Sequence, residues 1–229
     1  MNTFTPHKFE ITTAILVDGG FYRKRAKHYS GDCTPKERAD ELENFCRELL
    51  HNKSESRRLY RIFYYDCPPI AKKVYHPLLN RVVDLGKSDE YKWGMEFFDE
   101  LRKRRKFAVR LGTLSENTAQ FSLRPEALKK LISNRINVSD LTESDFMFKI
   151  EQKGVDMRIG VDIISMALKK QVQQIILVSG DSDFVPAAKQ ARREGLDVIL
   201  APMGAIIKPD LHEHIDGLIN RTTPKRLEE

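Results

Sequence analysis

The fold is decided by Val178-Ser179-Gly180-Asp181-Ser182-Asp183-Phe184, which joins an apolar run at 174–178 to a helical pattern at 184–194. A short apolar run of this kind is typical of a buried strand. The turn that follows brings backbone N–H groups and two carboxylates to the carboxyl end of that strand. Helix capping by Ser182 or Asp183 would explain one acid, but not a second at the strand end.

A second strand of the same kind lies near the N-terminus. Residues 13–17 form another apolar run, which ends in Asp18-Gly19-Gly20, and the two glycines allow a sharp turn into a helix. Asp18 and Asp181 therefore both stand at the carboxyl ends of strands. In a parallel sheet those ends share one edge, which is where such sheets bind ligands.

Strands and helices alternate along most of the chain, which predicts an α/β fold with a mainly parallel central sheet flanked by helices. We expect one domain over 1–220, with an excursion around 113–150, and a loose tail over 221–229. Gly195 stands where a helix C-cap is expected. Further strands are predicted at 59–65, 107–111 and 197–201, and helices at 35–50, 71–85, 92–105 and 156–170, with another opening at Pro125.

The composition is typical of a globular intracellular protein. The 229 residues are 41% hydrophobic and 31% charged, and the net charge of +6 favours encounter with nucleic acid. Cys33, Cys46 and Cys67 form no CxxC pair and have no His at zinc-ligand spacing, so neither a zinc knuckle nor a disulfide framework is expected. With no signal-peptide pattern over 1–10 and no apolar run of membrane-spanning length, we expect a cytoplasmic protein.

The helix predicted from Asp156 adds a third acid. At about 100° per residue, Asp156 shares a side of this helix with Ile163 and Ala167, so we expect it to point inward. Capping of the helix by Asp156 is the competing explanation. Asp162 lies on a polar stripe of the same helix, where pairing with Arg158 is favoured over a metal role.

These acids predict a metal site. Asp18, Asp156 and Asp181 come from three segments that converge if the sheet is parallel, and burying unpaired carboxylates is costly without a cation. Oxygen ligands without His or Cys suit Mg²⁺ or Mn²⁺, whose coordination substrate phosphate often completes. The expected substrate is a phosphodiester, attacked in line by a water that one or two ions activate.

Three motifs resemble the NYN domain, LabA-like branch: Leu16-Val17-Asp18-Gly19-Gly20-Phe21, Lys153-Gly154-Val155-Asp156 and Val178-Ser179-Gly180-Asp181-Ser182-Asp183-Phe184. The resemblance covers about 15–200, and the later two motifs at their mutual spacing are quite specific. It implies the PIN-like superfamily, with a three-layer, Rossmann-like fold and metal-dependent ribonuclease activity in several members. By position, Asp18, Asp156 and Asp181 resemble the family's catalytic metal ligands. Asp183 resembles a fourth acid that binds metal directly or through water.

Three positions need separate comment: Gly20, Asp162 and Asp66. Gly20 stands where an Asn is common, so a polar group that positions substrate or an acid is missing. The pattern has an acid where Asp162 stands, which conflicts with the helical-angle argument and leaves that residue open. Asp66, at the end of the strand at 59–65, is either an outer carboxylate or a turn cap.

Basic clusters along the chain suit RNA as a partner. The run of Arg102, Lys103, Arg104, Arg105 and Lys106 is expected either to contact RNA phosphates or to form a solvated face. Ser179 is a further candidate for substrate binding. Other clusters are Arg57-Arg58, Lys72-Lys73 and Lys129-Lys130, and the aromatic residues that could stack on bases, although core packing is favoured for most, are Tyr22, Tyr64, Tyr65, Tyr91 and Trp93.

The leading hypothesis is an endoribonuclease that depends on Mg²⁺ or Mn²⁺ and hydrolyses RNA phosphodiester bonds. A catalytically weak RNA-binding or regulatory module with the same basic surface is the alternative, which Gly20 leaves open. A phosphatase or nucleotide hydrolase is a third reading, but the chain has no P-loop and no DxDx[TV] motif near Asp18. A homodimer is compatible with the sequence, which does not specify the oligomeric state.

Overall fold

A computed structural model describes residues 10–52 and 55–223. Within it the chain divides into two compact units. The first contains the described residues up to Asp66, Glu96–Gly112 and the described residues from Gly154 onward. The second contains Cys67–Met95 and Thr113–Lys153. The excursion expected around 113–150 thus lies in the second unit, which also includes an earlier segment.

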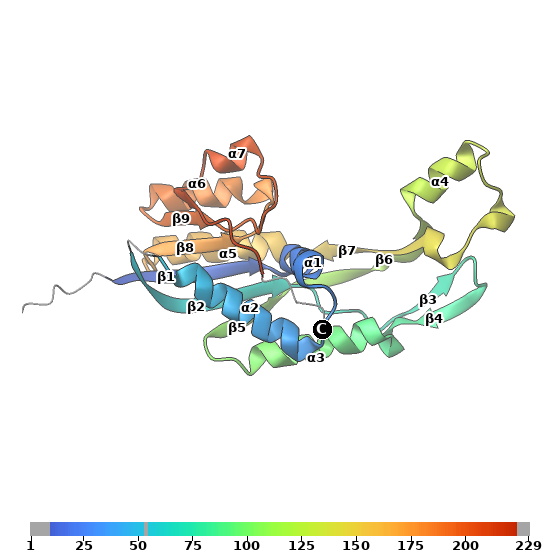
Figure 1. Ribbon diagram of the computed structural model, residues 1–229, viewed down its shortest axis with the longest axis horizontal. Coiled ribbons are helices and arrows are strands. Elements are labelled where there is room, and N and C mark those ends of the chain that lie inside the picture. The colour runs from blue at the N-terminus through green and yellow to red at the C-terminus, as the bar shows by residue number, and fades with distance from the viewer. Residues whose placement is uncertain (1–9, 53–54, 224–229) are drawn as a thin grey trace, which may run out of the picture. The chain divides into compact units, whose positions relative to one another are not determined.

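The first unit is built on a six-stranded sheet in the order β10-β9-β8-β1-β2-β5 (Figure 1). Every neighbouring pair in it is parallel, so all carboxyl ends lie along one edge. The fold is therefore the predicted three-layer α/β arrangement with a parallel central sheet. Its strands are β1 (Glu10–Asp18), β2 (Ser56–Asp66), β5 (Phe107–Leu111), β8 (Gln174–Val178), β9 (Asp197–Leu200) and β10 (Gly217–Leu218).

Helices cover both faces of this sheet. Successive strand residues point to opposite faces, and Tyr64 packs edge-on against Phe97 and Phe98 of α3, whereas the Tyr65 hydroxyl donates to Asp162 of α5. The part of α3 from Glu96 onward and α5 therefore lie on opposite faces. The helices of this unit are α1 (Gly19–Ser30), α2 (Pro35–Leu50), the second half of α3 (Asp89–Arg102), α5 (Val155–Leu168), α6 (Val185–Arg193) and the short α7 (Pro209–His212).

Local signals fix several of these elements where the sequence predicts them. Thr34 and Glu37 form a capping box at the start of α2, and Pro35 occupies its first turn, so the helix begins where its pattern begins. Gly195 has a positive φ of 82° after α6, as its predicted C-cap role requires. The predicted strands at 107–111 and 174–178 match β5 and β8 in both bounds.

The second unit is a set of antiparallel ribbons. β3 (Lys73–His76) pairs with β4 (Arg81–Asp84), and β6 (Thr113–Leu123) pairs with β7 (Phe146–Lys153). The His76 ring lies 4.5 Å from that of Phe121, which lies 5.5 Å from that of Phe148, so rings from both ribbons form its core. It also holds α4 (Pro125–Ile132), the first half of α3 and three 3₁₀ turns, η1 (Leu85–Lys87), η2 (Val138–Asp140) and η3 (Glu143–Asp145).

The helix predicted over 71–85 is wrong, because this segment forms the β3–β4 hairpin. Its apolar residues fit a helical period, but Pro77 interrupts a helical hydrogen-bond ladder and Asn80 adopts a left-handed φ of 51°. The segment is also rich in β-branched and aromatic residues, which favour a strand. Turn chemistry therefore overrides the periodicity here.

The end of the chain is held against the first unit as far as the structure describes it. The Ser30 hydroxyl donates to Thr223 Oγ1 at 3.0 Å, and Thr223 is buried. Arg221 forms an ion pair with Glu48. The tail predicted over 221–229 therefore has ordered contacts over 221–223, and its remainder, 224–229, lies outside the described residues.

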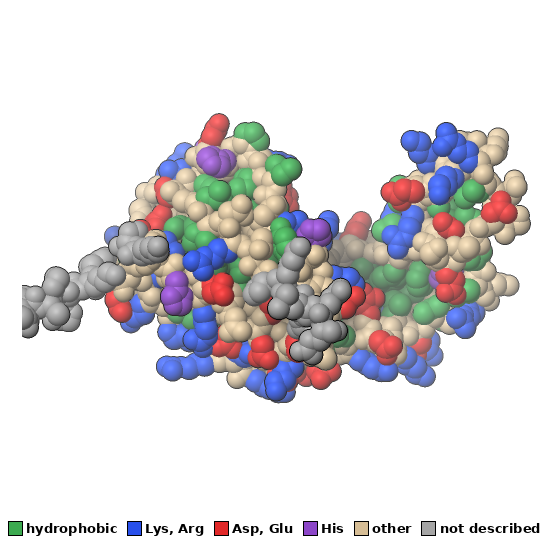
Figure 2. Space-filling model, in the orientation of Figure 1, with side chains coloured by type: hydrophobic (Ala, Val, Ile, Leu, Met, Phe, Trp, Pro, Cys, Tyr) green, Lys and Arg blue, Asp and Glu red, His purple; other side chains and the backbone are tan. Residues whose placement is uncertain are grey.

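Charged side chains of both signs are interspersed on the face drawn in Figure 2. Basic side chains gather there over α4, which carries the exposed Lys129 and Lys130. Within the described ranges, no helix has the length and apolar character needed to cross a bilayer. Exposed basic residues are thus not confined to the run at 102–106.

Gly19 is required by close packing where β1 turns into α1. A Cβ built at Gly19 would lie 2.6 Å from Asp66 Oδ2 and from the Tyr64 hydroxyl, whereas one at Gly20 would meet only Asp18 Oδ1, at an ordinary 3.6 Å. We expect Gly19→Ala to lower the free energy of unfolding by about 1–3 kcal/mol because the core must shift. Urea denaturation measures this effect, with Gly20→Ala as the matched control. Equal stability of the two variants would contradict the packing argument.

Candidate active site

Asp18 ends β1 and caps the helix that follows. Its Oδ1 accepts the Phe21 N–H at 3.1 Å, which fixes the carboxylate at the entry to α1. Because β1 pairs with β2 on one side and β8 on the other, this position is central in the sheet. Asp18 therefore presents its carboxylate in the middle of the carboxyl edge.

Ser179 connects Asp18 to the loop after β8. Its hydroxyl donates to Asp18 Oδ2 at 3.3 Å and accepts the Asp181 N–H at 3.2 Å. Asp181 Oδ1 in turn accepts the Asp183 N–H at 3.0 Å, at the start of the 3₁₀ turn η4 (Ser182–Phe184). These bonds hold two acidic segments against each other. Ser179 is fully buried, so its predicted contact with substrate would require it to leave these bonds.

Asp156 lies in the first turn of α5, and its side chain is exposed. The expectation that it points into the core is wrong: Ile163 and Ala167, on the same side of the helix, are buried, but Asp156 lies in the first turn, at the end of the helix, where its side chain is exposed. Partial burial, followed by the charges of Asp181 and Asp183, raises the pKa of Asp156. Asp156 thus faces the acids of the β8 loop, on the solvent side of the sheet edge.

The pKa of Asp18 is also raised. Burial is the largest cause, and the charges of Asp156 and Asp66 add to it, against the hydrogen bonds from Phe21 and Ser179 that lower it. Asp156 is therefore coupled to Asp18 on one side and to Asp181 and Asp183 on the other. These charge effects link all four acids that the sequence singled out, and their role as one site stays a prediction.

Positive charge does not compensate this cluster. Among residues 10–52 and 55–223, none of Asp18, Asp156, Asp181 and Asp183 forms an ion pair with Lys, Arg or His. Over the same ranges, no group of three or more His, Cys, Asp or Glu side chains is close enough to hold a metal ion. The two observations are consistent because charge repulsion acts over longer distances than metal coordination.

Asp66 ends β2 next to the cluster but is fully satisfied by its neighbours. Arg23 Nη2 lies 2.9 Å from its Oδ2, and the Tyr64 hydroxyl donates to the same oxygen at 3.1 Å. The Asp66 side chain is buried, whereas that of Arg23 is 36% exposed, so solvent screens this ion pair in part. Asp66 therefore acts on the site as a nearby negative charge whose own charge is already balanced.

Asp162 does not pair with Arg158, contrary to the expectation from helical spacing. Its Oδ2 accepts the Tyr65 hydroxyl at 2.8 Å and lies 3.4 Å from Arg110 Nε. Both partners come from neighbouring strands of the sheet, which α5 crosses. The predicted solvated stripe is thus a contact between helix and sheet at this position.

The basic run at 102–106 precedes β5 and so lies at the amino ends of the strands, away from the acids. Arg102 pairs with Asp99, Lys103 with Glu100, and Arg104 with both Asp40 and Glu43. Lys106 donates to the carbonyl oxygen of Leu59, and Arg105 is exposed. Phosphate contact by this run stays a prediction, and it would involve nucleotides distant from the acids.

The aromatic candidates divide between core and surface. Tyr22, Tyr64 and Tyr65 are buried in the first unit, so the core packing favoured for most of these residues holds for them. Tyr91 and Trp93 of α3 are half-buried in the second unit. Stacking on a base therefore stays a prediction for these two residues alone.

Comparison with known families identifies the fold. The family model of the NYN domain matches residues 71–217, which is more than half of the chain and includes Asp156, Asp181 and Asp183. The chain belongs to the NYN domain family. NYN domains are part of the PIN-like superfamily, whose members are nuclease-like hydrolases. The matched range begins after Asp18, whose link to the β8 loop is the pair of hydrogen bonds through Ser179.

Other comparisons add little to the NYN assignment. No curated protein matches the chain. A crystal structure of a protein of unknown function from Vibrio parahaemolyticus is similar over 94% of each chain, with 17% sequence identity and a TM-score of 0.47. A likeness at that score carries no argument about fold or function.

Sequence reasoning missed the partners that orient the site. The pairing of Asp66 with Arg23, of Asp162 with Arg110, and the bond from Lys208 to the Ser182 hydroxyl all join segments far apart in the chain. No local spacing signals such pairs. Only the strand order, which brings the segments together, could have revealed them.

The unpaired charge of Asp156 should reduce stability. We expect Asp156→Asn, in the presence of chelator, to raise the melting temperature and to add up to about 1 kcal/mol of stability, since the site is largely solvent-screened. Asp162→Asn should instead lower the melting temperature, because it removes the ion pair with Arg110. Thermal unfolding at neutral pH measures both. A loss of stability in Asp156→Asn would show that repulsion does not dominate the cluster.

Proposed function

We propose that this NYN domain is a metal-dependent endoribonuclease that hydrolyses RNA phosphodiester bonds at Asp18, Asp156, Asp181 and Asp183. The observation that supports this most is that four acids from three segments are electrostatically coupled without a cationic partner in the described residues. Acids kept close against their repulsion are typical of functional sites. The motif Leu16–Phe21 further supports the LabA-like branch.

The donor set fits Mg²⁺ or Mn²⁺. It consists of carboxylate oxygens alone, and Mg²⁺ in such enzymes is commonly bound by one or two carboxylates together with waters and substrate phosphate. The lack of a group of three close ligands among the described residues is consistent with that mode. When bound, the ion would supply a more acidic water and stabilise charge on the phosphate.

The protein's own residues would position and balance the site. Ser179, held between Asp18 and the Asp181 backbone, is a positioning residue that sets the spacing of the two acidic segments. The Phe21 N–H donates to Asp18 and lowers the pKa of this carboxyl, against the burial that raises it. Asp156 and Asp183 are exposed and open to an RNA phosphate that carries a cation.

Cleavage of labelled single-stranded RNA tests the proposal. Wild type should cut in Mn²⁺ or Mg²⁺ and not in EDTA, and Asp18→Asn and Asp181→Asn should each lose about 100-fold or more of the rate, because each removes a ligand charge and keeps the shape. Asp32→Asn, which changes an exposed acid paired with Lys27, is the matched control and should cut as wild type does. Equal cutting by all variants would exclude the aspartate cluster as the catalytic site.

A catalytically weak RNA-binding module is the second candidate, and the position of Gly20 favours it. A side chain at Gly20 would lie against Asp18 Oδ1, so the Asn common there in the family would contact this carboxylate. Its absence removes one polar group from the site. Tight RNA binding by wild type without metal-dependent cutting would support this candidate over the nuclease.

A further inference from the structure

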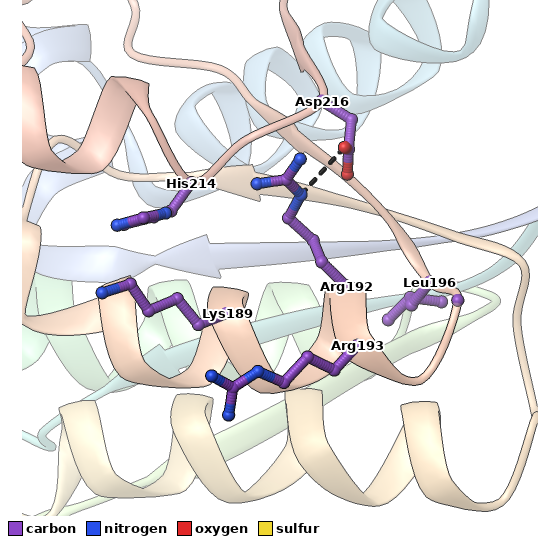
Figure 3. Close-up of a pocket in the computed structure, with 7 residues that line it drawn as sticks. Lys189, Arg192, Arg193, Leu196, His214 and Asp216 are labelled. Carbon is purple, nitrogen blue, oxygen red and sulfur yellow. Dashed lines mark hydrogen bonds and ion pairs between the residues drawn. The ribbon is translucent and has the colours of Figure 1, made fainter.

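A basic pocket lies at the far end of α6 from the acids. Its volume is about 590 Å³, and Figure 3 shows the side chains that line it, which come from α6, from the turn after it and from the segment before β10. They are Lys189, Arg192, Arg193, Leu196, His214 and Asp216. All of them belong to the first unit.

One cation of the pocket is fixed in place. Arg192 Nε lies 2.9 Å from Asp216 Oδ1, and Arg192 Nη1 donates to the Glu213 carbonyl oxygen at 3.3 Å. Asp216 Oδ2 is occupied as well, because it accepts the Val198 N–H at 2.9 Å. Both oxygens of Asp216 are thus already bonded within the protein, and Arg192 is held in place by two contacts.

Two further cations have no acid to balance them. Within 10–52 and 55–223, no carboxylate forms an ion pair with Lys189 or Arg193, and both side chains are exposed. Figure 3 shows the Lys189 amine on the same side of the pocket as the imidazole of His214. The lining therefore has a net positive charge in a concave surface, which suits an anion.

Helix electrostatics alone do not account for this arrangement. Cations in the last turn of a helix are stabilised by its dipole, and this explains Arg192 and Arg193. It does not explain Lys189, which lies one turn earlier, or His214, which lines the same pocket from a separate segment. Convergence from two segments is what distinguishes the pocket from an ordinary charged helix face.

We propose that this pocket binds the phosphodiester backbone of the RNA substrate several nucleotides away from the bond that is cut. The inference rests on the proposed function, because α6 begins at Val185, two residues after Asp183, and runs from the acids to the pocket. Ten residues separate Asp183 from Arg193, or about 15 Å at the helical rise. That span corresponds to roughly four stacked nucleotides.

Two properties follow from a contact with phosphates alone. Such contacts carry no sequence information, so the pocket should strengthen binding of all single-stranded RNA to a similar extent. It should also act only on RNA long enough to reach from the acids to the pocket. The pocket would then lower KM for long substrates and leave kcat unchanged.

RNA binding by Asp181→Asn protein, which should not cut, tests the pocket apart from catalysis. Adding Lys189→Ala and Arg193→Ala should weaken binding of a twelve-nucleotide RNA about tenfold and reduce the slope of log affinity against log salt by about 1.4, or about 0.7 per lost phosphate. A three-nucleotide RNA should bind equally to both proteins. The matched control is Lys27→Ala with Arg47→Ala, which removes the same charge from exposed, ion-paired side chains that have no proposed contact with RNA.

The outcomes separate the pocket from the proposed function. A loss with the pocket variant alone supports the pocket, even if wild type proves unable to cut RNA. An equal loss of RNA affinity in the control variant overturns the proposed pocket, because net charge alone would then explain the weaker binding. An unchanged affinity of the pocket variant overturns it as well. If wild type cuts RNA and the pocket variant binds RNA with unchanged affinity, the nuclease proposal holds and the pocket proposal fails.

Discussion

The structure depends on the parallel pairing of β1 with both β2 and β8. This pairing places the last residues of the strands along one edge, so Asp18 comes beside the loop that carries Asp181 and Asp183. An antiparallel neighbour would have sent those acids to opposite edges. The crossover helix α5 then begins at the same edge and adds Asp156. One constraint on strand direction thus accounts for the whole acidic cluster.

The surrounding acids show that the cluster is a special arrangement. Asp66 and Asp162 lie close by, and each is balanced by an arginine and a tyrosine hydroxyl. These two acids therefore differ from the other four in having a cationic partner. Asp18 and Asp181 accept hydrogen bonds from backbone N–H groups, and Asp18 also from Ser179, but none of the four acids at the edge has an ion-pair partner in the described part. Burial first, and then the charges of neighbouring acids, raise the pKa of Asp18 and of Asp156. That contrast favours a functional reason for their proximity.

Much of the fold was predictable because its signals are local. The apolar runs of β1 and β8, the proline and capping residues of α2, and Gly195 after α6 each determine their own element. The convergence of the acids followed from the alternation of strands and helices, which implies a parallel sheet. The candidate site residues are therefore predictable from the sequence.

The remaining features required information that a local pattern does not hold. The segment at 71–85 has a helical period but forms a hairpin, because Pro77 and Asn80 set a turn. Asp156 shares a side of its helix with the buried Ile163 and Ala167 but is exposed, because a helical angle does not show that the first turn extends past the covered part of the helix. Pairs such as Tyr65 with Asp162 join residues far apart in the chain and depend on how α5 crosses the sheet.

The central claim is that the four acids form one site for a divalent cation. Its most direct test is the binding of Mn²⁺ to wild type and to Asp156→Asn in the presence of an uncleavable RNA analogue. The paramagnetic signal of free Mn²⁺ measures this binding. The account predicts that wild type takes up Mn²⁺ and that Asp156→Asn binds it at least about tenfold more weakly. Equal uptake by the two proteins would contradict the account, as would the absence of uptake by wild type with RNA bound.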